Sequence, residues 1–200
     1  MWARTGAQTR RRRLWSRPLG ALFLAGAAAC GSDPLPPASP ILPTLPESAL
    51  TGYSVQTQVL DAGTIAAEVA DPDSAATALE GMRSALERRF SSRRAHEQQV
   101  IARTIRFASV EQAAGYVGWL DRHPADVLGA DPHDETVDLA GAVAYSHDPG
   151  GCCPGKEMVW WLVGWARGTD AFVLMVGGTQ VRAGIVDSLT TSLDGEADGT

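Results

Sequence analysis

The chain has 200 residues, a net charge of −6 at pH 7 and 44% hydrophobic residues, which is enough for one globular domain and its flanking segments. The charge is unevenly distributed: the segment before Cys30 holds six arginines and no acidic residue, and the remainder has 11 basic and 23 acidic residues, a net charge of −12. An anionic domain of this kind repels phosphate backbones, which argues against nucleic acid as a partner.

The first 29 residues have the order of an export signal. A group of arginines precedes an apolar stretch from Leu19 to Ala29, and Cys30 follows directly. About 11 apolar residues are roughly half of what a helix needs to cross the hydrocarbon core, so we expect this segment to be cleaved. The sequence Arg11-Arg12-Arg13-Leu14-Trp15 also resembles a twin-arginine motif. The general secretory route and the twin-arginine route therefore both stay open.

The residues around the expected cleavage site carry a resemblance. Ala27-Ala28-Ala29-Cys30, followed by Gly31-Ser32-Asp33, resembles the lipobox of bacterial exported lipoproteins. The resemblance implies removal of residues 1–29, a lipid on the Cys30 thiol, and residence on the extracytoplasmic face of the cell membrane. Many Ala, Arg and Gly residues beside a single lysine are typical of a high-GC genome and indicate an actinobacterial lipoprotein. Ordinary secretory cleavage after Ala29 is the alternative.

The mature chain divides into three parts. Six prolines between Gly31 and Glu47 favour extended backbone, so residues 30–49 are predicted to form the lipidated end and its tether. A single domain is expected over residues 50–193. The small and acidic residues 194–200 are predicted to be a disordered tail.

Within the domain, the same pattern occurs three times: a strand-like run, a capping residue and an amphipathic helix. The strands are expected at Thr64–Val69, Gln99–Phe107 and Ala171–Val176. The helical stripes comprise Leu79, Met82, Leu86 and Phe90; then Val110, Ala113, Ala114, Val117 and Leu120; then Ile185, Val186, Leu189 and Leu193. Ser109 and Gln112 form a capping box before the second helix. Two explanations of this threefold pattern stay open, namely a degenerate internal repeat and a coincidence between similar units.

Three further strands are expected, at Tyr53–Leu60, Val137–Tyr145 and Met158–Ala166. The last is apolar on both faces and should lie inside the sheet, joined to the next strand by a hairpin at Arg167-Gly168-Thr169-Asp170. Residues 125–138 should form a surface loop. The expected fold class is α+β, with a mixed or mainly antiparallel sheet of five or six strands packed by about three helices.

The most unusual segment of the domain runs from His147 to Gly155 and contains adjacent cysteines, Cys152 and Cys153. Outside the cytoplasm such cysteines oxidise, so a strained disulfide between them is possible. A redox switch and a soft-metal site of Cys152, Cys153 and His147 are the functional hypotheses. A bridge or thiol pair that only stiffens a turn is the simpler interpretation, and it is favoured.

Two other groups of residues could carry chemistry. The sequence His133-Asp134-Glu135 has metal-ligand side chains, yet neighbours on one loop cannot all face one ion, so a solvated acidic loop is favoured. Five aromatic residues could line an apolar ligand pocket, although plain core is favoured. These are Trp160, Trp161, Trp165, Trp119 and Tyr116.

No nucleophile elbow, phosphate loop, metalloprotease helix or dinucleotide fingerprint occurs in the sequence. We therefore predict a non-enzymatic domain without a cofactor, which binds a small ligand or docks an envelope protein. A redox or metal-handling protein built on Cys152 and Cys153 is the alternative.

Overall fold

The computed structural model describes residues 41–92, 98–129, 131–148, 158–179 and 181–198. Cys30, Cys152 and Cys153 lie outside these ranges. Residues 39–200 form one compact unit, and both of its hydrophobic clusters are built from residues between Leu45 and Ala197. A chain that starts at residue 39 therefore contains the whole described core.

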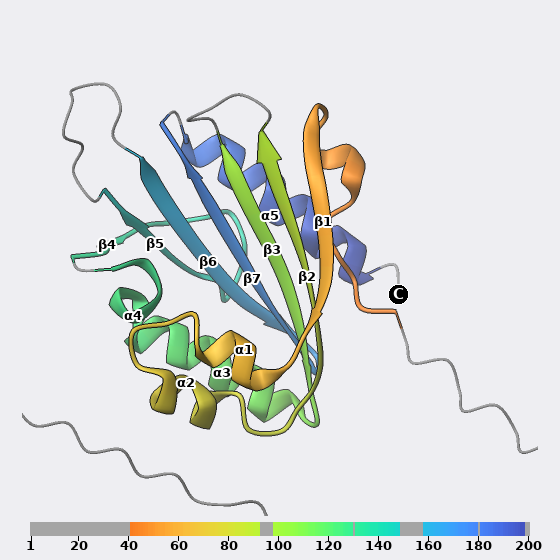
Figure 1. Cartoon of the computed structure of the whole chain (residues 1–200), viewed down its shortest axis with the longest axis vertical. Helices are drawn as coiled ribbons and strands as arrows, with labels where there is room; N and C mark the ends of the chain where they lie inside the picture. The colour runs from red at the N-terminus through yellow and green to blue at the C-terminus, as the bar shows by residue number, and fades with distance from the viewer. Residues whose placement is uncertain (1–40, 93–97, 130, 149–157, 180, 199–200) are drawn as a thin grey trace, which may run out of the picture. The chain divides into compact units, whose positions relative to one another are not determined.

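One antiparallel sheet organises the domain (Figure 1), in the order β1-β2-β3-β7-β6-β5-β4. The strands are β1 (Tyr53–Leu60), β2 (Met82–Ser92), β3 (Gln99–Phe107), β4 (His133–Asp134), β5 (Val143–His147), β6 (Val159–Arg167) and β7 (Asp170–Gly178). The helices are η1 (Glu47–Ala49, 3-10), α1 (Ala62–Ala66), α2 (Pro72–Ala78), α3 (Val110–Arg122), α4 (Pro124–Leu128) and α5 (Ala183–Asp198).

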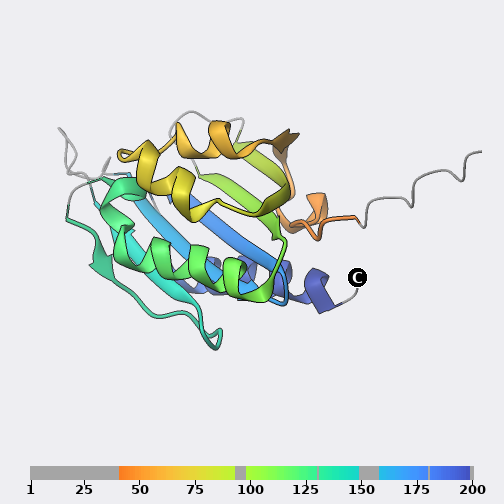
Figure 2. The same ribbon diagram turned by 90° about the horizontal axis from the view of Figure 1, so that it is seen from below.

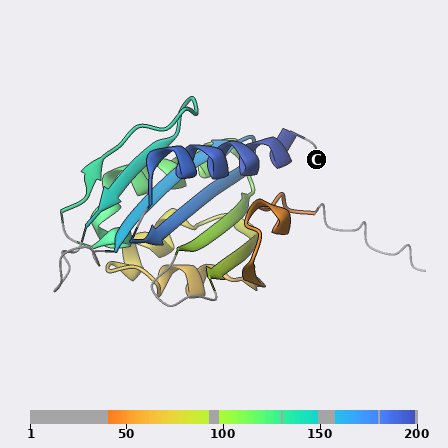
Figure 3. The same cartoon turned by 90° about the horizontal axis from the view of Figure 1, so that it is seen from above.

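Helices lie on both faces of the sheet, so each face has its own hydrophobic cluster (Figures 2 and 3). Helices α1 to α4 cover one face, where Leu120 of α3 packs against Leu162 and Val173. Helix α5 covers the other face with Val186 and Leu189. We call these the α3 face and the α5 face. Because strand side chains alternate, each central strand contributes apolar residues to both.

Several predicted elements are confirmed. Strands β1 and β3 have the expected bounds, and β6 joins β7 through the expected hairpin, in which Arg167 pairs with Asp170. Gly168 has a φ of 55°, the positive value that the first loop residue of a type II′ turn requires. The side chain of Ser109 accepts a hydrogen bond from the backbone N–H of Gln112, so the predicted N-cap of α3 forms. The Gln112 side chain does not complete the capping box, because its Oε1 has no partner within the described residues.

The predicted size of the sheet is wrong, because the sheet has seven strands rather than five or six, and every pairing is antiparallel. Five α-helices pack on the described part of the chain instead of about three. The extra strands are β2, where we expected a helix, and the two-residue β4.

The apolar residues of β2 are spaced three and four apart, which fits a helix, but the segment also alternates. Ala85 and Glu87 point to the α3 face, while Phe90 points to the α5 face. Strands on both sides, β1 and β3, satisfy its backbone hydrogen-bonding groups. This pairing outweighs the local helical pattern.

Two other predicted strands are displaced. Residues 64–69, expected as a strand, contain the end of α1, whose N-terminus is capped by the Asp61 side chain. The strand expected at 137–145 begins only at Val143. At the other end of the chain, α5 continues to Asp198, five residues past Leu193.

Candidate functional site

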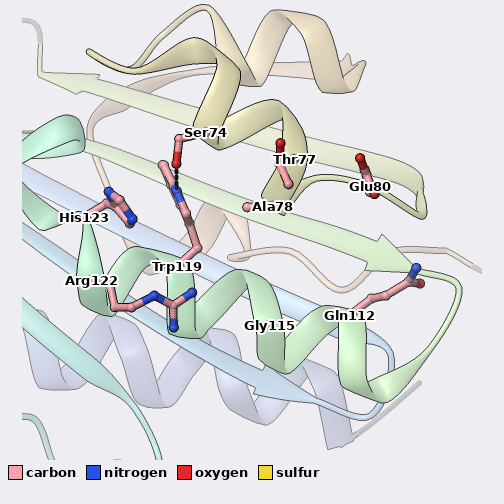
Figure 4. Close-up of a pocket in the computed structure, with 9 residues that line it drawn as sticks. All are labelled: Ser74, Thr77, Ala78, Glu80, Gln112, Gly115, Trp119, Arg122 and His123. Carbon is pink, nitrogen blue, oxygen red and sulfur yellow. Dashed lines mark hydrogen bonds between the residues drawn. The ribbon is translucent and has the colours of Figure 1, made fainter.

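A groove with a volume of about 520 Å³ lies between α2 and α3 (Figure 4). This volume lies in the range of small-molecule sites. The lining residues are Ser74, Thr77, Ala78, Glu80, Gln112, Gly115, Trp119, Arg122 and His123.

A helix cap, one hydrogen bond between the helices and two small residues explain why α2 and α3 stand beside each other with a gap. Helix α2 begins after Asp71, whose side chain accepts a hydrogen bond from the backbone N–H of Ser74. The indole N–H of Trp119 donates to Oγ of Ser74 at 2.8 Å, which joins α3 to α2. Ala78 and Gly115 carry little or no side chain, so the space between the helices stays open.

An aromatic row supports the floor of the groove. The ring centroids of Phe107 and Tyr116 are 5.7 Å apart, those of Tyr116 and Trp119 are 5.9 Å apart, and those of Trp119 and His123 are 5.5 Å apart. Rings at these separations attract each other. Because Tyr116 and Trp119 are buried in the core below, the floor is rigid.

The two ends of the groove carry opposite charges. Glu80 and Gln112 stand at one end, and Arg122 and His123 stand at the other (Figure 4). Within the described part of the chain, neither Glu80 nor Arg122 forms an ion pair. Both side chains are exposed and can therefore meet a ligand. The arrangement suits a molecule with a cationic and an anionic end.

The groove also contains the residue types of an acyl-transfer triad. His123 Nδ1 lies 3.0 Å from Asp126 Oδ2, and Ser74 stands on the opposite wall. In a working triad the second imidazole nitrogen is hydrogen-bonded to the serine hydroxyl. Among the described contacts, none joins His123 to Ser74; Oγ of Ser74 accepts the indole N–H of Trp119. Within the described residues, Ser74 and His123 are therefore not joined as a nucleophile and its base.

A second polar group lies on the α3 face between β2, β3 and the turn after α1. Glu87 is fully buried and accepts hydrogen bonds from Gln58, Arg89 and Arg103. Glu68 forms ion pairs with both arginines, including one of 2.8 Å to Arg89. Both carboxylate oxygens of Glu87 have donors, so this cluster is closed, and we assign it to structure. Sequence periodicity missed it because the spacing of Leu86 and Phe90 predicted a helix over this segment.

A smaller hollow of about 240 Å³ lies on the same face, lined by Ile101, Val127, Leu128, Trp160 and Met175. The indole of Trp160 lies over Gly177, where a Cβ atom would stand 2.6 Å from the ring. Of the aromatic residues predicted to line a pocket, Trp160 lines this one and Trp119 lines the groove. Trp161, Trp165 and Tyr116 are buried in the core.

The remaining candidate residues that the structure describes are His147, His133, Asp134 and Glu135. His147 is the last residue of β5, and its pairing partner on β6 is Trp160. His133 and Asp134 form the exposed β4, whereas Glu135 accepts a hydrogen bond from Ser146 at 2.7 Å. In the ranges that the structure describes, no group of three histidine, cysteine or acidic side chains could hold a metal ion.

Comparison with known proteins gives distant structural likenesses only. No family model matches the sequence, and no curated protein matches it. The extracellular domain of PknH from Mycobacterium tuberculosis superposes with a TM-score of 0.49 at 10% identity, over 73% of this chain and 82% of that one. An uncharacterized protein from Mycobacterium smegmatis, the Rv0999 ortholog, superposes with a TM-score of 0.32 at 6% identity, over 72% and 90% of the two chains. Likeness at this level assigns no function.

Proposed function

We propose that this chain is an exported lipoprotein, anchored through Cys30 on the extracytoplasmic face of the membrane, whose domain binds a small dipolar ligand and catalyses no reaction. The anchor is supported by the basic segment, the apolar segment and the small residues before Cys30. In the described part of the chain, no helix is long and apolar enough to cross a membrane.

The observation that carries the binding function is the groove between α2 and α3. It combines a rigid aromatic floor with two exposed groups of opposite charge at its ends, Glu80 and Arg122. Polar groups at the ends of an apolar floor orient a ligand and select for its charge pattern. Free amino acids and short peptides have the complementary pattern. Ligand binding at a membrane-anchored domain is the physical basis of a sensing or docking role.

The test is ligand binding by the chain from residue 39 to 200. We expect thermal unfolding in the presence of a panel of free amino acids and dipeptides to show at least one ligand that raises the Tm, because a ligand that binds only the folded state stabilises it. Arg122→Ala should weaken that ligand about tenfold or more, since it removes the partner of the anionic end. Arg83→Ala is the matched control, because Arg83 is exposed on β2 and lies outside the groove.

Native mass spectrometry of the same chain from an exporting host completes the test. A retained small molecule that disappears on denaturation, and is absent from Arg122→Ala, supports the proposal. If the panel leaves the Tm unchanged and the native mass equals the mass of the bare chain, the groove does not bind a ligand of this class.

A redox or metal-handling function at Cys152 and Cys153 is the second candidate. One described observation favours it: Nδ1 of His147 is buried and has no hydrogen-bond partner within the described residues. An imidazole nitrogen of that kind is suited to a metal ion. If this candidate holds, we expect the native protein to carry a stoichiometric metal or a disulfide with a defined redox potential, and Cys152→Ser should abolish either while the fold stays intact.

A further inference from the structure

Strand β1 forms one edge of the sheet, and its outer side pairs with no described strand (Figure 1). Its eight residues include no charged residue and no proline. Natural edge strands are usually protected by a lysine, a proline, a bulge or a very short length. The opposite edge follows that rule, because β4 has two residues. The unprotected edge of β1 is therefore available to a further strand.

The sequence of this edge is self-complementary. Residues 55–59 read Val-Gln-Thr-Gln-Val, a palindrome centred on Thr57. If a second copy of β1 pairs antiparallel with a two-fold axis at Thr57, each Val55 faces a Val59, each Gln56 faces a Gln58, and Thr57 faces itself. Threonine pairs are favourable across strands, facing amides can donate to and accept from each other, and facing valines remove apolar surface from water. No charged side chain is brought opposite another.

The faces of the strand agree with this pairing. Val55 packs with the cluster of the α5 face and Leu60 with the cluster of the α3 face. Alternation therefore places Val59 on the α5 face and Gln58 on the α3 face. Val59 is 79% exposed, and a second Val55 would cover it. Gln58 donates its amide N–H to Glu87, which leaves its carbonyl oxygen for a second donor.

The tether of the same chain is a poor occupant of this edge. It contains Pro34, Pro36, Pro37 and Pro40, and proline has no backbone N–H to donate to a ladder. A charged partner strand would find no opposite charge on the neutral β1, whereas a second β1 matches it over residues 55–59. The observations therefore favour a second copy of the chain.

We propose that two copies of this domain associate through antiparallel pairing of β1 with β1, about a two-fold axis at Thr57, which joins their sheets into one. Such an interface is closed, because each copy has a single unprotected edge. The expected product is a dimer and no larger assembly. This inference does not depend on the groove or on its ligand.

The test is sedimentation equilibrium of the chain from residue 39 to 200 between micromolar and millimolar concentration, in which the wild type should reach twice the monomer mass. Thr57→Lys should weaken the dimer at least about tenfold, because it places two like charges directly opposite each other. Thr57→Glu should do the same. An equimolar mixture of the two variants should dimerise again, since unlike charges then meet at the axis. Thr191→Lys, at an exposed position of α5, is the matched control and should dimerise as the wild type does.

Three results would overturn the proposal. A wild type that stays monomeric throughout the concentration range shows that the edge does not bind a second copy. Equal dimerisation of the wild type and Thr57→Lys shows that the interface lies elsewhere. A mixture that stays monomeric shows that Thr57 does not face itself. Circular dichroism of each variant confirms that the sheet is intact, which the exposure of Thr57 predicts.

Discussion

At the scale of single residues, Glu87 connects three neighbouring strands of the sheet. It lies in the middle of β2 and receives hydrogen bonds from β1, from its own strand and from β3, through Gln58, Arg89 and Arg103. Arg103 is itself buried. The cluster has two carboxylates, Glu68 and Glu87, and two guanidinium groups, those of Arg89 and Arg103, so its net charge is zero. Removal of one charge would therefore leave another buried without its partner.

Replacing Glu87 by glutamine should lower the free energy of unfolding by about 3–5 kcal/mol, because the variant leaves the Arg103 guanidinium buried without its closest carboxylate. Urea unfolding at pH 7 measures the change. Glu196→Gln, at an exposed position of α5, is the control and should change stability by no more than about 0.5 kcal/mol. A loss for Glu87→Gln as small as that of the control would show that the cluster contributes nothing.

The ionisation of Glu87 should make the free energy of unfolding depend on pH. Burial would raise the pKa of the Glu87 carboxyl, but the hydrogen bond from Arg89 and the charge and hydrogen bonds of Arg103 outweigh burial and hold the pKa below 4.5. A carboxyl whose pKa is lower in the folded state stabilises the fold above its unfolded pKa, and this contribution is lost as the pH falls through the folded pKa. The wild type should therefore lose stability from about pH 4.5 downward, and Glu87→Gln should lose less over the same range. Urea unfolding of both proteins at successive acidic pH values decides this.

At the scale of elements, the segment before β1 belongs to the fold as well as to the tether. Leu45 is fully buried in the cluster of the α5 face. The carbonyl oxygen of Pro43 accepts a hydrogen bond from Thr104 at 2.7 Å, and that of Leu45 accepts one from Arg88 at 2.9 Å. These contacts hold residues 43–45 against β2 and β3. The proline-rich composition that predicted a tether up to residue 49 does not reveal this.

Leu45→Ala should destabilise the domain by about 2–5 kcal/mol, because it removes a fully buried side chain and leaves a cavity. Ile41→Ala is a matched control in the same segment, since Ile41 is 82% exposed. Thermal and urea unfolding of the two variants measure the difference. Equal stability of the two would mean that the segment is not part of the folded domain.

The C-terminal end of α5 shows the same dependence on distant partners. Asp194 accepts hydrogen bonds from the Trp165 indole at 2.9 Å and from Arg167 at 2.8 Å, and its side chain is buried. These contacts attach the last turns of the helix to β6. The acidic composition after Leu193, which predicted a frayed tail, is here part of a charge-assisted contact.

At the scale of the whole molecule, the proposed lipid anchor should determine whether the protein is found in the membrane fraction. Cys30→Ser should move the exported protein from the membrane fraction to the soluble fraction and should prevent incorporation of labelled palmitate, because the thiol that receives the lipid is absent. Fractionation of cells that express each form measures this. Cys152→Ser is the matched control and should stay in the membrane fraction. Membrane association of Cys30→Ser equal to that of the wild type would contradict the lipid anchor.

Parts of the candidate site could be predicted from the sequence where they depend on one segment of the chain, and could not where they depend on contacts between distant segments. The sequence indicated α3 and its cap, because a local capping box and a 3.6-residue pattern act within one segment. It could not indicate the groove, which requires Ser74 and Trp119 to meet across 45 positions. The pairing of Glu87 with Arg103 was hidden for the same reason. Cys152 and Cys153 lie outside the described residues, so their role stays a prediction.

The sequence by itself determined those features that depend only on residues close to each other along the chain. These are the strands β1 and β3, the hairpin between β6 and β7, and the stripe of α5. The export signal is also a local pattern, and it stays a prediction. Only the tertiary structure decided that Met82–Ser92 is a strand, since its apolar spacing fits a helix as well, and two neighbouring strands had to supply its hydrogen bonds. Tertiary structure alone also placed Leu45 in the core and left β1 at an open edge. Burial and strand order depend on contacts between distant segments, and a local pattern carries no information about them.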